Sequence, residues 1–173
     1  MAVDANVFRE VFGALPTAVA VVTANGPHGP SGLACNTVAA VSLRPPLLLV
    51  CVDRGSLTLG AIRDSGAFVV NYLLAGRGEL CDRFAGKLPD KFSGVSHVAS
   101  VVAAGAPVLT EDSLAVAECV LTEAVETGDH WILIGLIEHA TVYGGTPLTY
   151  FRRRYDSWPE ARPAGSAAVR EVV

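Results

Sequence analysis

The sequence predicts one mainly β domain that closes, fully or partly, into a barrel with a few short helices. The first observation is a succession of short valine- and leucine-rich segments separated by proline- and glycine-rich turns. The second is the length, since 173 residues suit one domain with a sizeable core. The third is the mean hydropathy of +0.42, which favours sheets buried on both faces or a partner subunit that covers apolar surface.

Three short helices are predicted, over residues 4–14, 57–65 and 79–84. The first has apolar side chains at helical spacing and ends at Pro16, which cannot continue a helix. The second follows Ser56 and precedes Gly66, which is the order of an N-cap, a helix and a C-terminal glycine.

Six strands are expected, over residues 17–23, 31–41, 47–52, 67–73, 114–126 and 131–143. The run 47–52 is apolar without alternation, which predicts burial on both faces. The Gly-Asp pair within residues 127–130 suits a tight hairpin turn between the last two strands. Residues 87–94 are expected to form an irregular loop. The stretch 159–173 lacks aromatic residues and is expected to be a disordered tail outside the domain of residues 1–158.

Charge and hydropathy exclude nucleic-acid and membrane partners. Thirteen basic and seventeen acidic side chains give a net charge of −4, and the one basic cluster, Arg152-Arg153-Arg154, is too short to neutralise a run of phosphates. The longest apolar runs are far shorter than a membrane-spanning helix. Asp4, Arg9 and Glu10 interrupt any signal-peptide core. A cytoplasmic protein is expected.

The four cysteines, Cys35, Cys51, Cys81 and Cys119, stand far apart, and none has a partner at zinc-like spacing. We expect reduced and mostly buried thiols, and no metal site. Motifs for a Rossmann dinucleotide site, a P-loop, a zinc protease and a serine hydrolase are all missing. If the protein is an enzyme, a cofactor is expected to carry the reaction.

Residues 53–58, with the sequence DRGSLT, carry the strongest local signal. A strand ends, a glycine turns the chain, and Ser56 caps a helix whose first N–H groups and dipole favour an anion. This pattern indicates a phosphate site or merely a capped surface helix. Lys91 and Phe92 either bind a phosphate and a flat ring or pin their loop to the core. His130 either contacts a ligand or occupies an exposed strand end.

The ordered set of segments TAVAVVT, GLACNTVAAVSLRPPLLLVCVDRGSLT, IRDSGAFVVNYL, DRFAGKLPDKFSGV, GAPVL, ETGDHWILIG and PLTYFRRRY resembles the short-chain flavin reductases of the flavin reductase-like family. The likeness extends from about Phe8 to Tyr155. It implies a split β-barrel of the FMN-binding type with Greek-key-like connections. It also implies a homodimer with flavin near the subunit interface.

The resemblance implies two groups of flavin contacts. Residues along the isoalloxazine ring are Cys35, Asn36, Thr37 and Val38. Residues at the ribityl phosphate end are Cys51, Asp53, Ser56, Leu57 and Thr58. In addition, Lys91 and Phe92 match a flavin-contacting pair of the family.

The nicotinamide side is implied in the same way. His130, in a Gly-Asp-His motif, is the candidate catalytic residue and lies near the nicotinamide, while Arg154 and Tyr155 help form the pyridine-nucleotide pocket. Ala34, Ala40 and Val38 depart from the common pattern and leave FAD or FMN open. Arg153 also departs, because it replaces a common glycine. No cofactor-discriminating acidic residue separates NADH from NADPH.

The implied activity is reduction of flavin by NADH or NADPH through hydride transfer, with delivery of the reduced flavin to a flavin-dependent monooxygenase component. Three alternatives stay open: a flavin-binding carrier or sensor without turnover, an oxidase with tightly bound flavin, and a structural module with no ligand.

Overall fold

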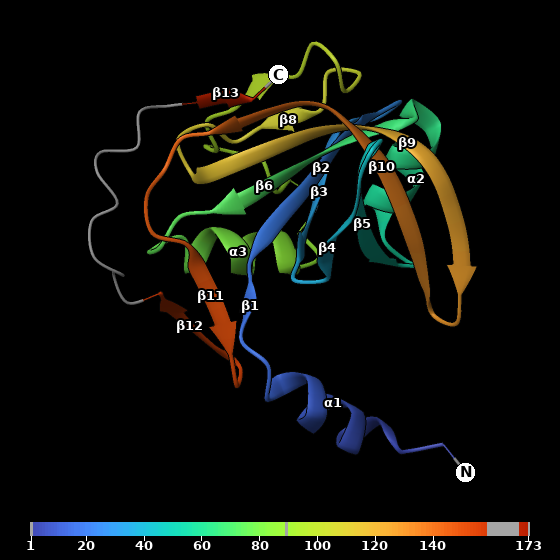
Figure 1. Cartoon of the computed structure of the whole chain (residues 1–173), viewed down its shortest axis with the longest axis vertical. Coiled ribbons are helices and arrows are strands. Elements are labelled where there is room, and N and C mark those ends of the chain that lie inside the picture. Colours follow the sequence, from blue (N-terminus) through green and yellow to red (C-terminus); the bar gives the residue numbers. More distant parts are fainter. Residues whose placement is uncertain (1, 89, 159–169, 173) are drawn as a thin grey trace.

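One long antiparallel sheet dominates the computed structural model, which describes residues 2–88, 90–158 and 170–172. Its strands follow the spatial order β3-β2-β6-β9-β10-β5-β4. Their bounds are β2 (Ala20–Gly26), β3 (Gly29–Cys35), β4 (Val38–Leu43), β5 (Pro46–Asp53), β6 (Ala67–Leu73), β9 (Ser113–Thr127) and β10 (His130–Val142). In Figure 1, β9 and β10 form a long curved hairpin at the right of the barrel.

A short connection closes this sheet. β3 and β4 stand at opposite ends of the strand order, yet only Asn36 and Thr37 separate them in the sequence. Three Cα-to-Cα steps span about 11 Å at most, so the two edges of the sheet must approach each other. The β3 edge reaches the other end of the sheet where the Sγ of Cys35 lies 3.8 Å from the carbonyl oxygen of Cys51 on β5, the strand paired with β4. The result is the split β-barrel that the sequence predicts.

Two helices lie against the barrel at positions where glycine permits close approach. α2 (Leu57–Ser65) packs on β2, where a Cβ at Gly26 would come within 2.9 Å of the Ala61 side chain. α3 (Gly78–Ala85) packs on β3, where a Cβ at Gly32 would come within 2.7 Å of the Phe84 ring. A side chain at either glycine would push its helix off the sheet.

A smaller three-stranded sheet joins the two ends of the domain. It consists of β1 (Thr17–Ala18), β11 (Leu148–Phe151) and β12 (Arg154–Ser157), in the order β1-β11-β12. α1 (Ala5–Gly13) precedes this sheet and extends away from the barrel in Figure 1. None of its residues is buried. β7 (Val98–Ala99) and β8 (Pro107–Val108) form a separate short hairpin.

The core fills the barrel and is almost entirely aliphatic. Val22, Val50, Val52, Phe68 and Leu133 are fully buried in its main cluster. Within the described part of the chain, no helix is long and apolar enough to cross a membrane.

The three predicted helices are confirmed, and the differences from the expected strands lie at breaks and ends. A single strand over 31–41 is wrong, because the chain crosses from one sheet edge to the other at Asn36 and Thr37. The segment 17–23 also divides, at Val19, whose N–H donates to Leu148. The short strands β7, β8, β11 and β12 were not expected, since each pairs with a partner that no local pattern reveals.

Two further expectations differ from the structure. Burial of residues 47–52 on both faces is wrong: Leu48, Val50 and Val52 are buried, whereas the alternate side chains are only half-buried. Most of the expected tail, residues 159–169 and 173, lies outside the described residues. The three residues Arg170–Val172 instead form β13, which pairs with the end of β10, where no pairing with β5 remains and the backbone is free to bond.

Candidate active site

The turn between β5 and α2 presents the N-terminus of a nine-residue helix. Asp53 shapes this turn, because its Oδ1 accepts a hydrogen bond from the N–H of Gly55 at 2.7 Å and its carbonyl accepts one from Ser56 at 3.0 Å. The Oγ of Ser56 then accepts from the N–H of Thr58 at 3.3 Å and caps the helix. Its hydroxyl proton remains available to a ligand, and no acidic residue stands in the first turn.

The β9–β10 hairpin turn lies beside this helix start. His130, the first residue of β10, is the register partner of Asp53, the last residue of β5. The N–H of Arg54 also donates to the carbonyl oxygen of Asp129 at 3.0 Å, which ties the two turns together. The structure thus brings the predicted phosphate end and the predicted nicotinamide-facing histidine to one end of the barrel.

The His130 ring is held by its neighbour. Its Nδ1 lies 2.7 Å from Oδ1 of Asp129, and the hydrogen bond with His130 is the main cause that lowers the pKa of the Asp129 carboxyl. An ionised Asp129 accepts the bond, so Nδ1 carries the proton and Nε2 is left for another partner. The imidazole side chain is about half exposed.

The predicted ring-contacting residues gather at the corner between β3 and β4. The Oγ1 of Thr37 lies 3.4 Å from both the Cys35 Sγ and the Cys51 carbonyl oxygen. Burial is the main cause that raises the pKa of the Cys35 thiol, which therefore stays neutral. Val38 pairs with Val50 on the neighbouring strand. Asn36 is exposed and lies outside both ladders, so its backbone groups can reach a flat ligand.

Lys91 and Phe92 lie against β3 and α3. The Nζ of Lys91 donates to the carbonyl oxygens of Gly32, at 3.1 Å, and Phe84, at 2.8 Å. Burial lowers the pKa of this ammonium group. The Phe92 ring packs edge-on against Phe84, with centroids 5.1 Å apart. Both side chains therefore pin their loop to the barrel, as the simpler interpretation predicts, and a third proton of Lys91 remains for an anion.

Thr58 and Leu57 differ sharply in exposure. Thr58 is buried, and its Oγ1 lies 2.9 Å from the Oγ of Ser31, a contact that joins α2 to β3. Leu57, in contrast, is 89% exposed at the start of α2. Sequence reasoning missed Ser31, because its partner is 27 residues away and no local pattern links the two. Asp129 was within the Gly-Asp-His motif but was not assigned a role.

Arg154 and Tyr155 stand apart from the other candidates. They lie on β12, which Figure 1 shows on the opposite side of the barrel from the β9–β10 turn. The Tyr155 hydroxyl donates to Oδ1 of Asp82 on α3 at 2.6 Å. Burial and this hydrogen bond raise the pKa of the phenol, so Tyr155 stays neutral. Arg154 is exposed. Within one chain, these two residues do not meet His130.

The sequence of this chain matches a known protein family. The model of the flavin reductase-like domain matches residues 12–159. The chain belongs to the flavin reductase-like family. This match confirms the resemblance noted from the ordered sequence segments.

Individual relatives cover nearly the whole chain. A flavin reductase (NADH) of Kitasatospora aureofaciens is 42% identical over 174 residues, which is 96% of this chain and 88% of the relative. The reductase subunit HsaB of a flavin-dependent monooxygenase from Rhodococcus jostii is 37% identical over 155 residues, which is 89% of this chain and 78% of the relative. Among solved structures, the Streptomyces globisporus NADH:FAD oxidoreductase SgcE6, in complex with NAD and FAD fragments, superposes with a TM-score of 0.83. It is 32% identical, and the match covers 95% of this chain and 99% of that one.

The residues at this site have the chemical groups that a flavin needs. The helix start and the Ser56 hydroxyl offer donors to a phosphate, without a carboxylate in the first turn to repel it. The corner of Cys35, Thr37 and Val38 consists of small side chains beside the exposed Asn36, whose backbone lies outside both ladders. β5 connects the two parts of the site. It carries Cys51, beside the corner of Cys35 and Thr37, and Asp53, at the turn before α2.

Proposed function

We propose that the protein reduces FMN or FAD with NADH or NADPH and passes the reduced flavin to a monooxygenase component. Membership of the flavin reductase-like family supports this reaction. The pairing of Asp53 with His130 is the observation that supports particular residues as the site of this reaction. It sets an imidazole next to a helix start that suits a phosphate, so an anchor for flavin and a guide for nicotinamide share one end of the barrel.

Hydrogen-bond donors hold the phosphate of the flavin, and the corner between β3 and β4 holds its ring. Bound there, its ring system supplies the acceptor for the hydride. The N-terminus of α2 and the Ser56 hydroxyl hold the phosphate, and the remaining proton of Lys91 adds a charged donor. The corner from Cys35 to Val38 lies along the ring. Thr58, whose hydroxyl is engaged with Ser31, supports the site by holding α2 against β3.

His130 orients the second substrate. Asp129 fixes the proton on Nδ1, so Nε2 faces outward as the polar group for the carboxamide of the nicotinamide. Hydride transfer needs the two rings in contact and aligned, and it needs no strong acid at this position. The protein therefore contributes mainly orientation.

We also propose that the protein is a homodimer and that residues from both subunits form each site. β12, which carries Arg154 and Tyr155, lies on the opposite side of the barrel from the β9–β10 turn in Figure 1, so a second copy has to bring these residues to the same nicotinamide. α1 supports the idea of a partner, since Phe8, Val11 and Phe12 are each more than half exposed. An apolar helix face of this kind is normally covered.

A partner oxygenase and a cytoplasmic location complete the proposal. The likeness to a monooxygenase reductase subunit supports the first. The four free cysteines agree with the second, because disulfides are rare in a reducing compartment.

NADH oxidation measured with and without added flavin tests the reaction. A flavin reductase oxidises NADH only when FMN or FAD is supplied. A carrier or sensor would bind flavin without turnover, and an oxidase with tightly held flavin would consume oxygen without needing NADH. Either of these results would overturn the proposed activity.

Mixing two impaired variants tests the shared site. His130→Ala and Tyr155→Phe subunits, combined after partial unfolding or co-expressed, form mixed dimers in which one site carries both changes and the other carries neither. We expect activity well above that of either variant alone. Activity no higher than the average of the two parents would mean that each site draws both residues from one subunit, and would overturn the shared site.

A further inference from the structure

Tyr72, on β6, is a partly buried side chain that has no role in the site described above. On the same strand, Phe68 and Val70 belong to the main core cluster inside the barrel, and Tyr72 packs against that cluster. Because alternate residues of a strand share a face, Tyr72 lies on the inner face with the other two. The phenol is therefore part of the lining of the barrel and not of its outer surface.

Strand register directs this side chain toward the corner between β3 and β4. Tyr72 is the partner of Ala20 on β2, and Ala20 is in turn the partner of Cys35 on β3. The three residues form one row across neighbouring strands, so their side chains share a face. Two strand spacings separate the backbones of Tyr72 and Cys35 by about 10 Å. Only the methyl group of Ala20 stands between them, which leaves the long phenol side chain room to lean toward Cys35.

The phenol keeps its proton and is open to a ligand. Burial is the main cause that raises the pKa of Tyr72, and the nearby thiols of Cys119 and Cys35 raise it further. The effect of Cys35 agrees with a phenol that leans toward the corner. Among the described residues, the hydroxyl has no hydrogen-bond partner, and it is not one of the fully buried atoms. Tyr72 thus presents an unused O–H donor at an accessible position.

The other polar side chains of this corner are already engaged. The Oγ1 of Thr37 lies 3.4 Å from both the Cys35 Sγ and the Cys51 carbonyl oxygen. The Nδ2 of Asn36 donates to Oγ1 of Thr17 at 3.4 Å. A flavin ring carries carbonyl oxygens and unprotonated ring nitrogens, and such acceptors cost free energy when they are buried without donors. The corner therefore needs a further donor for the ring.

Resting on the proposed function, which places the flavin ring at this corner, we propose that the Tyr72 hydroxyl donates a hydrogen bond to the pyrimidine half of the bound ring. That half carries the acceptor atoms, whereas the dimethylbenzene half carries none. Tyr72 then contacts the flavin from β6, a strand that holds none of the other flavin residues. The contact is to the ring, which riboflavin, FMN and FAD share, and not to the phosphate.

Titration with riboflavin, which has the ring but no phosphate, tests this contact without turnover. Tyr72→Phe removes only the hydroxyl and keeps the aromatic ring in the core. We expect the dissociation constants of riboflavin and FMN both to rise about three- to tenfold, the size of one neutral hydrogen bond. Ser56→Ala, at the phosphate end, should weaken the binding of FMN and leave riboflavin unchanged. Wild-type affinity of Tyr72→Phe for both flavins, or a loss for FMN alone, overturns the inference.

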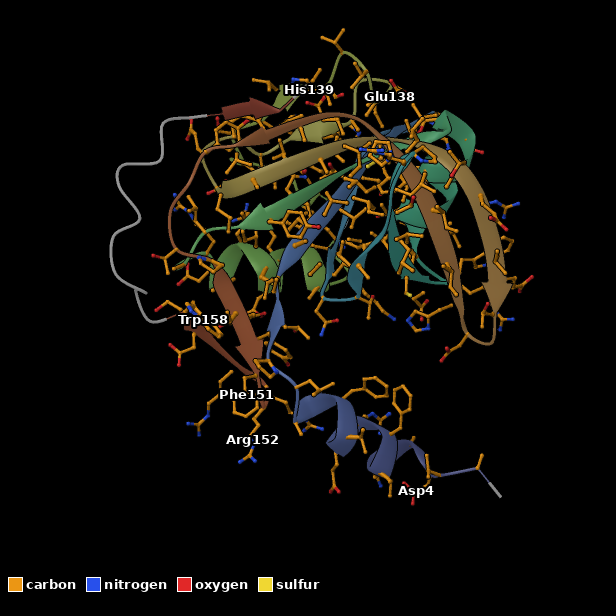
Figure 2. The ribbon with its side chains drawn as sticks, viewed as in Figure 1. Asp4, Glu138, His139, Phe151, Arg152 and Trp158 are labelled. Carbon is orange, nitrogen blue, oxygen red and sulfur yellow. The ribbon has the colours of Figure 1, made fainter. Side chains whose placement is uncertain are left out.

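Tyr143→Phe is the matched control. Tyr143 packs against the separate cluster that contains Val69, on the other face of β6. Figure 2 shows Glu138 and His139, on the same half of β10 as this control, at the top of the molecule, whereas the β9–β10 turn lies low on its right side. Tyr143→Phe should bind both flavins as the wild type does.

Thermal unfolding of the flavin-free protein separates a ligand contact from a structural role. Tyr72→Phe should melt at the wild-type temperature, because the hydroxyl has no partner among the described residues. A lower melting temperature with unchanged riboflavin affinity would assign the hydroxyl to the fold and overturn the contact.

NADH oxidation by the same proteins distinguishes this inference from the proposed function. If the wild type reduces flavin and Tyr72→Phe binds riboflavin equally well, the contact fails and the proposed function stands. If Tyr72→Phe binds riboflavin more weakly and the wild type oxidises no NADH with either flavin, the contact stands and the proposed activity fails.

Discussion

His130 stands directly across the β5–β10 ladder from Asp53, and the adjacent Arg54 N–H bonds to the carbonyl of Asp129. The strand that ends at Asp53 turns at once into the capped start of α2. An imidazole and a set of helix N–H donors are therefore fixed relative to each other by backbone pairing rather than by flexible side chains. Such rigid placement is what orientation of two ring systems requires.

Replacing His130 with alanine should slow the reaction without releasing the flavin. We expect kcat/KM for NADH to fall about 10- to 100-fold, because the nicotinamide loses its guide. The dissociation constant of flavin should change less than about twofold. Stopped-flow reduction and a flavin titration measure the two quantities. Asp129→Asn should show a smaller loss, since it weakens the bond that holds Nδ1.

A matched control for that histidine lies on the β2–β3 turn. His28→Ala removes an exposed imidazole from another part of the molecule and should leave both quantities unchanged. Wild-type kinetics in His130→Ala would remove this residue from the reaction.

Replacing Lys91 should weaken flavin binding and loosen a loop. Lys91→Met removes one positive charge and leaves the carbonyl oxygens of Gly32 and Phe84 without their donor. Loss of these partly buried hydrogen bonds costs about 1–3 kcal/mol. We expect the flavin dissociation constant to rise about tenfold and the melting temperature of the flavin-free protein to fall. Lys87→Met, at an exposed lysine of the same segment, is the control. A flavin titration that matches the wild type would show that Lys91 acts only on the loop.

Gly135 tests the packing inside the barrel. A Cβ at this position would come within 2.6 Å of the Phe68 ring and 2.8 Å of the Cys119 side chain, both fully buried. Gly135→Ala should therefore lower the free energy of unfolding by about 1–3 kcal/mol. Gly60→Ala, on the exposed face of α2 with open space around it, should raise it by about 0.5–1 kcal/mol. Urea denaturation measures both, and equal effects at the two positions would contradict this account of the core.

The raised pKa of Tyr155 predicts a loss of stability at alkaline pH. Its pKa is raised in the folded protein by burial and by the bond to Asp82, so the fold favours the neutral phenol. This contribution is complete below the usual pKa of 10.0 and is lost as the pH rises through the folded value. The wild type should be more stable than Tyr155→Phe at neutral pH, and the difference should shrink above a pH of about 10. Unfolding curves across the alkaline range measure it, and a constant difference would contradict the bond.

The helices could be predicted from the sequence because their signals are local. Ser56 and Gly66 mark the two ends of α2, and the structure places them there as N-cap and C-cap. The closure of the barrel could not be predicted in the same way. It depends on β3 and β4 lying at opposite edges of one sheet, which no single segment encodes. The sequence around Asn36 and Thr37 therefore predicts a continuous strand where the structure has a short link.

Part of the candidate site can likewise be predicted from local sequence, and part of it arises only from the tertiary fold. The cap at Ser56 is a local signal, whereas the opposition of Asp53 and His130 follows from the pairing of strands far apart in the sequence. The double role of Lys91, which bonds to β3 and α3, arises from the tertiary fold alone. The separation of β12, which carries Tyr155, from the β9–β10 turn likewise depends on the tertiary fold.

Anaerobic single-turnover reduction of flavin tests the central claim most directly. The protein is mixed with FMN or FAD and either NADH or NADH deuterated at the nicotinamide C4, and the bleaching of the flavin is followed. If the two rings lie face to face at the His130 end of the barrel, the flavin is reduced and the deuterated substrate reacts several-fold more slowly. A flavin that stays oxidised, or a reduction with no isotope effect in the His130→Ala variant and the wild type alike, would contradict it.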